Sequence, residues 1–191
     1  MSQQNINTEV HNAFEVIKNG GIILYPTDTV WGIGCDATNA EAVKKIYALK
    51  QREESKSMIV LMNSDRMMYN VFKEIPDVAW ELIELSDKPT TLILDNPSNV
   101  AQNIIAADNT LAVRLVKEPF CYKLMERMKK PLVSTSANVS GMPTPKSFKE
   151  IDRHILDGVD YVVNLHDEKN AAKPSTIIKL GNDLQVKVIR P

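Results

Sequence analysis

The sequence predicts an α/β fold built on one twisted, mixed β-sheet with helices packed against it. Apolar, strand-like runs alternate with amphipathic helical stretches in the first part of the chain, whereas strand-like runs dominate the last part. That order is typical of a mixed sheet and not of a purely doubly wound parallel sheet. The 191 residues contain no internal repeat, low-complexity tract or linker, so we expect a single domain over residues 1–191.

The N-terminal part begins with a predicted amphipathic helix. Asn7 or Thr8 can serve as its N-cap, and the glycines at 20 and 21 favour its end. Its apolar face consists of Val10, Phe14 and Ile17. The run GIILY then predicts a buried strand, and residues 26–39 are expected to form a long loop after the strand breaks at Pro26.

The middle of the chain alternates between helices and strands. Asn39 is expected to cap a helix whose apolar side is formed by Val43, Ile46, Tyr47 and Leu49. MIVLM predicts a buried strand, and SDRMMYNVF and PDVAWELIEL predict short helices, the second with Pro76 in its first turn. The next expected elements are the strands TTLIL and LAVRLV, the helix PFCYKLMERMKK and the strand PLVSTS.

The C-terminal part is expected to open with a turn-rich loop, SANVSGMPTPKS. Ser147 and Glu150 have the spacing of a capping box and are expected to begin the last helix. DYVVNL, STIIKL and LQVKVIR predict strands, the last two joined through GND as a hairpin. Antiparallel pairing of that hairpin would bring Ser175 beside Arg190.

Composition limits the classes of function. With 23 basic and 24 acidic residues, a net charge of −1 excludes a globally basic nucleic-acid coat but leaves room for a local basic groove. No apolar run is long enough to cross a bilayer, and the first residues lack a signal-peptide core. Cys35 and Cys121 lie far apart and form no CxxC motif. We therefore expect reduced thiols in a cytoplasmic protein.

Several common catalytic motifs are absent from the sequence. It has neither GxxxxGK[ST] nor GxGxxG, which are the standard phosphate-binding loops, and no GxSxG nucleophile elbow. His11, His154 and His166 are scattered, so they predict no zinc site and are expected to be surface or partly satisfied side chains.

The loop YPTDTVWGIG is a first candidate for ligand binding. The hydroxyls of Thr27 and Thr29 flank Asp28, and the glycines allow close approach to the backbone. A polar turn with Trp31 in the core explains the same residues, and this segment alone favours that second interpretation.

LKQREESKS is a second candidate, because Lys50, Arg52 and Lys56 follow the expected end of a helix. Cations are favoured at helix C-termini, so these residues can be a solvated last turn. They can equally form a clamp for a polyanion, since Arg supplies a planar fork and Lys a mobile point charge. Helix-terminal spacing by itself does not separate the two.

STSANVSGMPTP is the third candidate, with Ser134, Thr135, Ser136, Asn138 and Ser140 gathered at the end of an apolar strand. Ser134 and Ser136 lie on one face of that strand, which favours ligand binding by neutral hydrogen bonds over a simple turn.

Arg114 interrupts the otherwise apolar run LAVRLV, so it is either an edge-strand charge or a buried partner for an anion. Together, the residues predict an anion-binding α/β domain and leave the anion open.

Six longer segments add a resemblance. They are GGIILYPTDTVWGIGCDATN, IYALKQREESKSMIVLM, TLAVRLV, PLVSTSANVSGMPTP, PSTIIKL and VIRP. In this order, and over nearly the whole chain, they resemble the YrdC-type threonylcarbamoyl-AMP synthase family. Lys50 with Arg52 matches the KxR motif of the family, and Ser136 with Asn138 matches its SxN motif.

The resemblance implies a nucleotidyltransferase that makes threonylcarbamoyl-AMP and pyrophosphate from L-threonine, bicarbonate or CO2, and ATP. The product would feed N6-threonylcarbamoyladenosine (t6A37) modification of tRNA through a downstream tRNA threonylcarbamoyl transferase complex. Both reactants are anionic, so Lys50, Arg52 and Lys56 would reduce repulsion and absorb charge on the leaving group, with Mg²⁺ bound through the ATP phosphates.

The resemblance also implies individual roles. Lys50 and Arg52 are expected to be catalytic. The expected L-threonine site consists of Thr29, Arg114, Ser134 and Ser175, with Arg114 pairing the amino-acid carboxylate. The expected ATP site consists of Arg52, Lys56, Thr110, Ser136, Asn138, Thr144 and Arg190.

The chain departs from many relatives at Leu61, where they have histidine, and at Val116, where they have proline. Because it ends at Pro191, the short, single-domain form is expected, with the basic concave surface of the family. The alternative hypothesis is a module without synthase activity that uses this surface to bind double-stranded RNA or tRNA.

Overall fold

The computed structural model describes residues 3–53, 58–165, 174–181 and 185–191. Its strands form one nine-stranded sheet in the order β7-β1-β2-β6-β3-β5-β4-β8-β9. The strands are β1 (Ile23–Tyr25), β2 (Gly32–Gly34), β3 (Ile59–Met62), β4 (Thr90–Asp95), β5 (Thr110–Leu115), β6 (Leu132–Ser136), β7 (Tyr161–Val162), β8 (Thr176–Leu180) and β9 (Val186–Arg190).

Pairing within this sheet is mixed, which confirms the predicted fold class. The pairs β1–β7, β3–β5 and β4–β8 are parallel, whereas β1–β2, β2–β6, β3–β6, β4–β5 and β8–β9 are antiparallel. Segments distant in sequence therefore become neighbours: β6 lies between β2 and β3, and β5 lies between β3 and β4.

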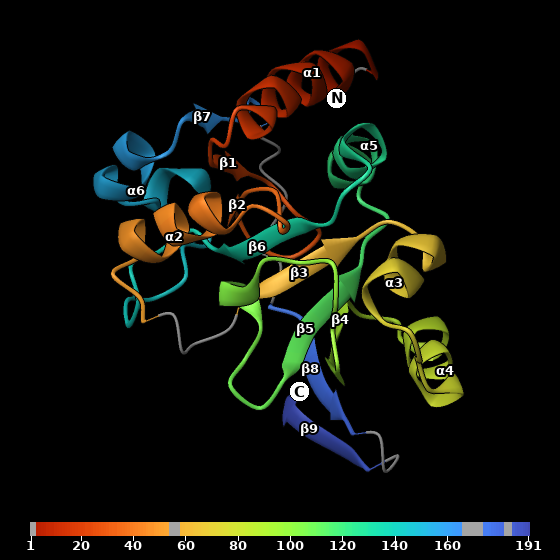
Figure 1. Ribbon diagram of the computed structural model, residues 1–191. Helices are drawn as coiled ribbons and strands as arrows, with labels where there is room; N and C mark the ends of the chain where they lie inside the picture. Colours follow the sequence, from red (N-terminus) through yellow and green to blue (C-terminus); the bar gives the residue numbers. More distant parts are fainter. Residues whose placement is uncertain (1–2, 54–57, 166–173, 182–184) are drawn as a thin grey trace.

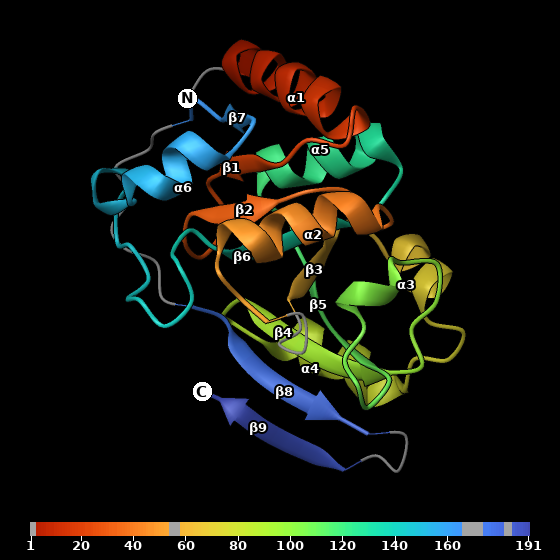
Figure 2. The same ribbon diagram turned by 60° about the vertical axis from the view of Figure 1, so that its left-hand side comes forward.

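Helices cover both faces of the sheet (Figures 1 and 2). They are α1 (Gln3–Lys18), α2 (Ala40–Leu49), α3 (Asp65–Val71), α4 (Asp77–Leu85), α5 (Pro119–Met128) and α6 (Arg153–Gly158), with the 3₁₀ turns η1 (Gln102–Ile104) and η2 (Phe148–Glu150). Asn39 caps α2 as predicted, because its side chain accepts hydrogen bonds from the Glu41 and Ala42 amides. Gly20, at φ +76°, ends the turn after α1.

Two apolar clusters show which helices lie on which face. Ile23, Tyr25 and Leu61 pack with α1 and α5, whereas Leu24 and Val60 pack with the layer that contains α2 and α6. Adjacent residues of a strand point to opposite faces, so each strand contributes to both clusters. Ser134 and Arg114 each follow a residue of the α2 layer, and they therefore lie on the face that α1 and α5 cover.

The structure corrects several expected boundaries. Helix α1 begins at Gln3 and not near Asn7 or Thr8, because polar side chains such as Gln and Asn are acceptable inside a helix. Pro76 is the residue before α4 and not part of its first turn. Asn182 and Asp183 of the expected GND turn lie outside the described ranges, but the antiparallel pairing of β8 with β9 is confirmed.

Two further expectations, about residues 26–39 and about the start of the last helix, were wrong. Residues 26–39 are not one long loop, because β2 lies within them and pairs with both β1 and β6. Ser147 and Glu150 do not open the last helix: Ser147 precedes η2, Glu150 is the last residue of η2, and α6 begins later with Asp152 as its cap. The Asp152 carboxylate accepts from the His154 amide at 2.7 Å, which provides the stronger cap.

Other expectations concern single side chains and membrane segments. Cys35 and Cys121 are both buried free thiols, and burial raises the pKa of each. His11 contacts Arg127 and His154 contacts the Leu49 carbonyl, whereas His166 lies outside the described residues. Within the described ranges, no helix has the length and apolarity that a membrane crossing needs.

Candidate active site

A pocket of about 230 Å³ gathers most of the predicted site residues. This volume is below the roughly 300–1,000 Å³ of pockets for drug-sized ligands, so the pocket can enclose a ligand of amino-acid size, and a larger ligand would extend beyond it. The predicted residues that line it are Thr29, Arg52, Arg114, Ser134, Ser136, Thr144, Ser175 and Arg190. Lys50, Thr110 and Asn138 are not among its lining residues, and Lys56 lies outside the described residues.

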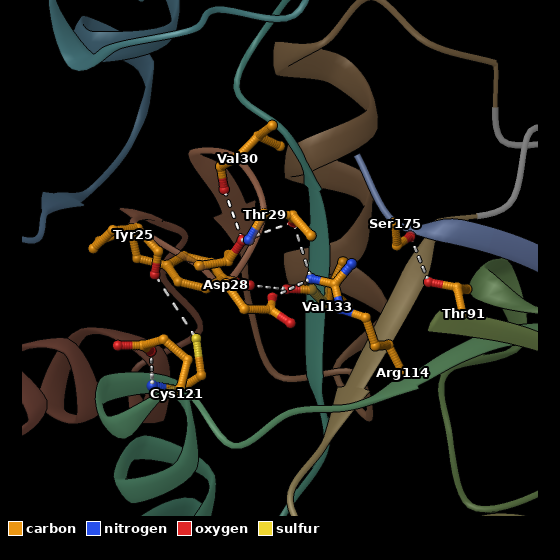
Figure 3. A network of polar contacts seen from close by, with 12 residues as sticks. Tyr25, Asp28, Thr29, Val30, Thr91, Arg114, Cys121, Val133 and Ser175 are labelled. Carbon is orange, nitrogen blue, oxygen red and sulfur yellow. Dashed lines mark hydrogen bonds and ion pairs between the residues drawn. The ribbon is translucent and has the colours of Figure 1, made fainter. Parts of the chain in front are cut away.

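Arg114 lies in the middle of the sheet, so the edge-strand interpretation was wrong. Its side chain is 4% exposed and forms an ion pair with Asp28, with 2.8 Å between Nη2 and Oδ1. The same nitrogen donates to Thr29 Oγ1 at 3.2 Å (Figure 3). Its Nε atom is buried and has no partner. Arg114 is therefore a buried cation that lines the pocket and keeps unused donor capacity.

The loop between β1 and β2 holds Asp28 in place. Thr27 Oγ1 donates to the Val30 carbonyl at 2.8 Å and accepts from the Thr29 amide at 3.0 Å. The hydroxyl oxygens of Thr27 and Thr29 are 3.0 Å apart. These bonds explain the TDT pattern, because the Thr27 hydroxyl fixes backbone on the far side of Asp28 and the Thr29 hydroxyl contacts both Thr27 and Arg114.

Strand β2 is built from glycines because its neighbours come too close for side chains. A Cβ atom on Gly34 would lie 2.4 Å from the Val133 carbonyl oxygen and 2.7 Å from the Tyr25 ring. A Cβ atom on Gly32 would lie 3.2 Å from Ser134 Oγ, at the wall of the pocket. The glycines thus let β6 approach β2 and leave the Ser134 hydroxyl accessible to a ligand.

The C-terminal hairpin lines another side of the pocket, and it brings Ser175 beside Arg190 as predicted. Arg190 Nε donates to the Ser175 carbonyl at 2.9 Å, and its Nη2 donates to Ser175 Oγ at 3.3 Å. Ser175 Oγ is also 2.8 Å from Thr91 Oγ1 (Figure 3). Burial, and then the charge of Arg114, lower the pKa of Arg190. Both guanidinium groups line the same pocket, and an anionic ligand there would relieve the repulsion between them.

Lys50 occupies a different place from the one expected. Its side chain is almost fully buried, and Nζ donates to the backbone carbonyls of Ser136 and Asn138. Burial, and then the charge of Arg52, lower the pKa of Lys50 to about 8. Lys50 therefore lies behind the wall of the pocket, whereas Arg52 lines the pocket itself.

Thr110 and Asn138 also have mainly internal partners. Thr110 Oγ1 donates to Asp108 Oδ1 at 2.7 Å at the start of β5. Asn138 Nδ2 donates to the carbonyls of Val139 and Met142, whereas its Oδ1 atom is buried without a partner. In this arrangement both residues stabilise loops at the ends of strands.

The pocket has a marked charge asymmetry. Three arginines line it, and no Asp or Glu does so among the described residues. Asp28 lies between the lining residues Thr27 and Thr29, and its carboxylate already pairs with Arg114. Across the described part of the chain, no group of three or more His, Cys, Asp or Glu side chains could hold a metal ion. The pocket is therefore suited to an anionic ligand.

A family model described as "Telomere recombination" (Sua5/YciO/YrdC) matches residues 15–191. The chain belongs to the Sua5/YciO/YrdC family. A member of this family from Acinetobacter baumannii, named threonylcarbamoyl-AMP synthase, is 31% identical over 193 residues, which cover 97% of this chain and 100% of that one. A Halorhodospira halophila protein of the same name is 33% identical over 155 residues, 81% of each chain.

Solved structures of the family have the same fold. P. abyssi Sua5, in a structure of its complex with L-threonine, matches with a TM-score of 0.83 and 28% identity. The match covers 95% of this chain and 53% of that one, so the chain spans about half the length of P. abyssi Sua5. E. coli YciO matches with a TM-score of 0.80 and 25% identity, over 95% of this chain and 87% of that one.

Sequence reasoning missed two features of the site. Asp28 was noted only as the residue between two threonines, although it is the ion-pair partner of Arg114. The carbonyl partners of Lys50 were also missed, because backbone atoms leave no signal in residue type. Leu61 lies opposite Arg114 in the register of β3 with β5, and this buried leucine supplies apolar packing there.

Proposed function

We propose that the chain is an L-threonylcarbamoyladenylate synthase, which makes threonylcarbamoyl-AMP and pyrophosphate from L-threonine, bicarbonate or CO2, and ATP. The main support is the pocket, which combines three arginines with a row of serine and threonine hydroxyls and no lining carboxylate. The similarity to relatives that carry this name over most or all of their length supports the same reaction.

The amino-acid end of the pocket would be formed by Thr29, Arg114, Ser134 and Ser175. Arg114 would bind the threonine carboxylate, since its buried guanidinium retains donors that Asp28 does not use. Ser134 and Ser175 would supply neutral hydrogen bonds to the hydroxyl and amino groups of the substrate.

The nucleotide end would be formed by Arg52, Ser136, Thr144 and Arg190, all of which line the pocket. Thr110, Asn138 and Lys56 complete the set that the family resemblance implies. In the reaction, the threonine amino group adds to CO2 and loses a proton to give the carbamate, and an oxygen of this carbamate then attacks the α-phosphorus of ATP and forms the new P–O bond. The bond from that phosphorus to the bridging oxygen breaks, and its electrons leave with pyrophosphate.

The role of the protein in this step would be alignment and charge stabilisation. Arg52 and Arg190 would bind phosphate oxygens and stabilise the charge that develops on the pyrophosphate. No covalent nucleophile on the protein is required, which agrees with buried thiols whose pKa burial raises.

We further propose that Mg²⁺ enters with ATP and is held by the phosphate oxygens. This fits a pocket without lining carboxylates, because Mg²⁺ commonly keeps several waters and binds through substrate phosphates. When bound, the ion would neutralise part of the phosphate charge, and the arginines would act on the rest.

The product would pass to a tRNA threonylcarbamoyl transferase complex in the cytoplasm for t6A37 formation. The alternative, a module that binds double-stranded RNA or tRNA without synthase activity, does not account for a buried arginine and hydroxyls in a pocket of amino-acid size. An RNA surface would instead present exposed cations to phosphates.

Threonine-dependent pyrophosphate release tests this proposal. The protein is incubated with ATP, Mg²⁺ and bicarbonate, with and without L-threonine, and pyrophosphate is measured. We expect release only with threonine, and its loss in Arg114→Met but not in the matched control Arg153→Met, because Arg153 is 87% exposed on α6. Pyrophosphate release that does not depend on threonine, or no pyrophosphate release under any condition, would refute the synthase assignment.

A further inference from the structure

The ammonium group of Lys50 is enclosed by backbone carbonyls. Nζ donates to the carbonyl oxygen of Asn138 at 2.5 Å and to that of Ser136, and the residue is only 1% exposed. The Lys50 carbonyl in turn accepts from the Ser140 amide at 2.8 Å. One residue therefore holds the loop after β6 at three points, through both its side chain and its backbone.

The end of helix α2 separates Lys50 from Arg52. Gln51 has a left-handed backbone with φ 50°, and the Arg52 amide donates to the Tyr47 carbonyl at 3.0 Å. This αL ending of the helix reverses the chain within two residues. As a result, Lys50 points into the protein and Arg52 reaches the pocket.

The carbonyls that Lys50 holds belong to a segment that shapes the pocket. Ser136 lines the pocket, and its carbonyl also accepts from the Asn138 amide at 2.9 Å. Between them, the Ala137 amide donates to the Trp31 carbonyl at 3.0 Å. Once the carbonyls of this segment point inward to Lys50, the Ser136 side chain is fixed on the pocket side of the strand.

We propose that Lys50 is a positioning residue, which fixes Ser136 relative to Arg52 in the nucleotide end of the pocket and does not itself touch the substrates. The inference rests on the nucleotide binding proposed above. It differs from the role that the KxR motif suggests, in which both cations meet the triphosphate. Arg52 would bind the phosphate, and Lys50 would keep Ser136 in position relative to Arg52.

The number of donors makes the two roles separable. A charged ammonium has three N–H groups, and a neutral amine still has two, which match the two carbonyls. Positioning therefore survives loss of the proton, whereas attraction to phosphate does not. Among the residues that the structure describes, the charged and titratable groups near Lys50 are Arg52 and His154, whose Nε2 lies 3.0 Å from the Leu49 carbonyl.

Hydrogen exchange of the ligand-free protein tests the inference independently of activity. In Lys50→Met we expect the amides of Asn138 and Ser140 to exchange about tenfold faster or more, because their loop loses two donors. Lys45→Met is the matched control: Lys45 lies on the same helix and donates to the Gly20 carbonyl, far along the chain from the loop. Unchanged exchange of both amides in Lys50→Met would overturn the proposal.

ATP binding at two pH values separates positioning from direct contact. The pKa of Lys50 is about 8, so wild-type protein is compared at pH 7.5 and pH 9.5 with Mg²⁺ and without threonine. We expect a constant affinity for the wild type and an affinity about tenfold to a hundredfold lower in Lys50→Met at both pH values.

Either of two results would contradict this. A wild-type affinity that falls as the pH passes 8 would show that the charge itself meets phosphate, and wild-type affinity in Lys50→Met would show that the tether is dispensable. If the wild type binds no ATP at any pH, the proposed function fails, and the exchange experiment still decides the role of Lys50. The wild-type titration and exchange at the Ser140 amide in Lys50→Arg keep the test valid if Lys50→Met does not fold.

Discussion

Arg114 and Lys50 are both buried cations, but their surroundings differ. Arg114 meets a carboxylate, Asp28, and lines the pocket with a buried Nε that has no partner. Lys50 meets two backbone carbonyls and does not line the pocket. A carboxylate neighbour stabilises the charged form of a cation, whereas carbonyl dipoles alone compensate poorly for burial. The pKa of Lys50 accordingly falls to about 8.

This difference indicates a division of labour among the cations of the site. A guanidinium with spare donors at a pocket wall can bind a ligand, whereas a buried ammonium that donates to two backbone carbonyls behind the wall holds the chain. Motif spacing places Lys50 and Arg52 together, yet the turn after α2 sends them in different directions. Residue type and proximity in sequence are therefore insufficient to assign a role.

The largest expected effect is that of Arg52→Ala on catalysis. If Arg52 stabilises the charge on the leaving pyrophosphate, its loss should lower kcat about 100- to 1,000-fold while the fold is retained. Steady-state pyrophosphate release and circular dichroism measure the two quantities. Arg66→Ala, which removes an exposed arginine of α3, is the control and should keep full activity. Near-normal turnover in folded Arg52→Ala would remove Arg52 from the reaction centre.

A second prediction uses the lowered pKa of Lys50. Its folded-state pKa of about 8 lies below its ordinary value of 10.5, so between these values the unfolded chain binds more protons. The free energy of unfolding should then rise with pH relative to Lys50→Met, by up to about 3 kcal/mol between pH 7.5 and 10.5. Denaturant titrations of both proteins at several pH values measure this difference. A constant difference would mean that the ammonium is not desolvated.

A third prediction concerns the ion pair of Arg114. Arg114→Met leaves Asp28 unpaired, and because Asp28 is 24% exposed we expect a cost of about 2–3 kcal/mol, below that of a fully buried pair. Adding Asp28→Asn should recover most of this loss in denaturant unfolding. Lys179→Met, which breaks the exposed pair with Asp108, is the control and should leave unfolding nearly unchanged. No recovery in the double variant would show that Arg114 contributes by packing and not by charge pairing.

A smaller effect is expected at the C-terminus. Deleting Arg190 and Pro191 removes the contacts to Ser175 and one of the three pocket arginines, so ATP should bind about tenfold more weakly. Calorimetry at matched salt and Mg²⁺ measures this. Lys187→Ala, within the same strand, should bind as the intact chain does. Equal affinity in the truncated chain would show that Arg190 only closes the sheet.

The sequence predicted the fold well wherever periodicity was strong. Strand β3 is a continuous apolar run, β5 is apolar except at Thr110 and Arg114, and α2 has both a cap and an apolar face. It failed at β2, where Gly32 and Gly34 give no strand signal because the close approach of β6 and Tyr25 excludes side chains. The sequence-based prediction also failed at η2. The capping-box spacing predicted a helix from Ser147, whereas Asp152 caps α6, which begins later.

The candidate site was predictable in its residues but not in their partners. The hydroxyls of β6 and the meeting of Ser175 with Arg190 follow from strand alternation and hairpin pairing, and the structure has both. The pairing of Arg114 with Asp28 joins residues 86 positions apart, and the Lys50 bonds end on backbone atoms. Neither leaves a local pattern in the sequence, because both depend on how the sheet orders its strands.

Separate binding of the two substrates to two variants tests the division of labour most directly. The dissociation constants of L-threonine and of ATP are measured by calorimetry for the wild type, Arg114→Lys and Lys50→Met. We expect Arg114→Lys to weaken threonine binding about tenfold or more and to leave ATP binding unchanged, because Lys keeps the charge but loses the planar fork. Lys50→Met should show the reverse pattern. Equal weakening of both ligands in both variants, or an exchanged pattern, would contradict the account.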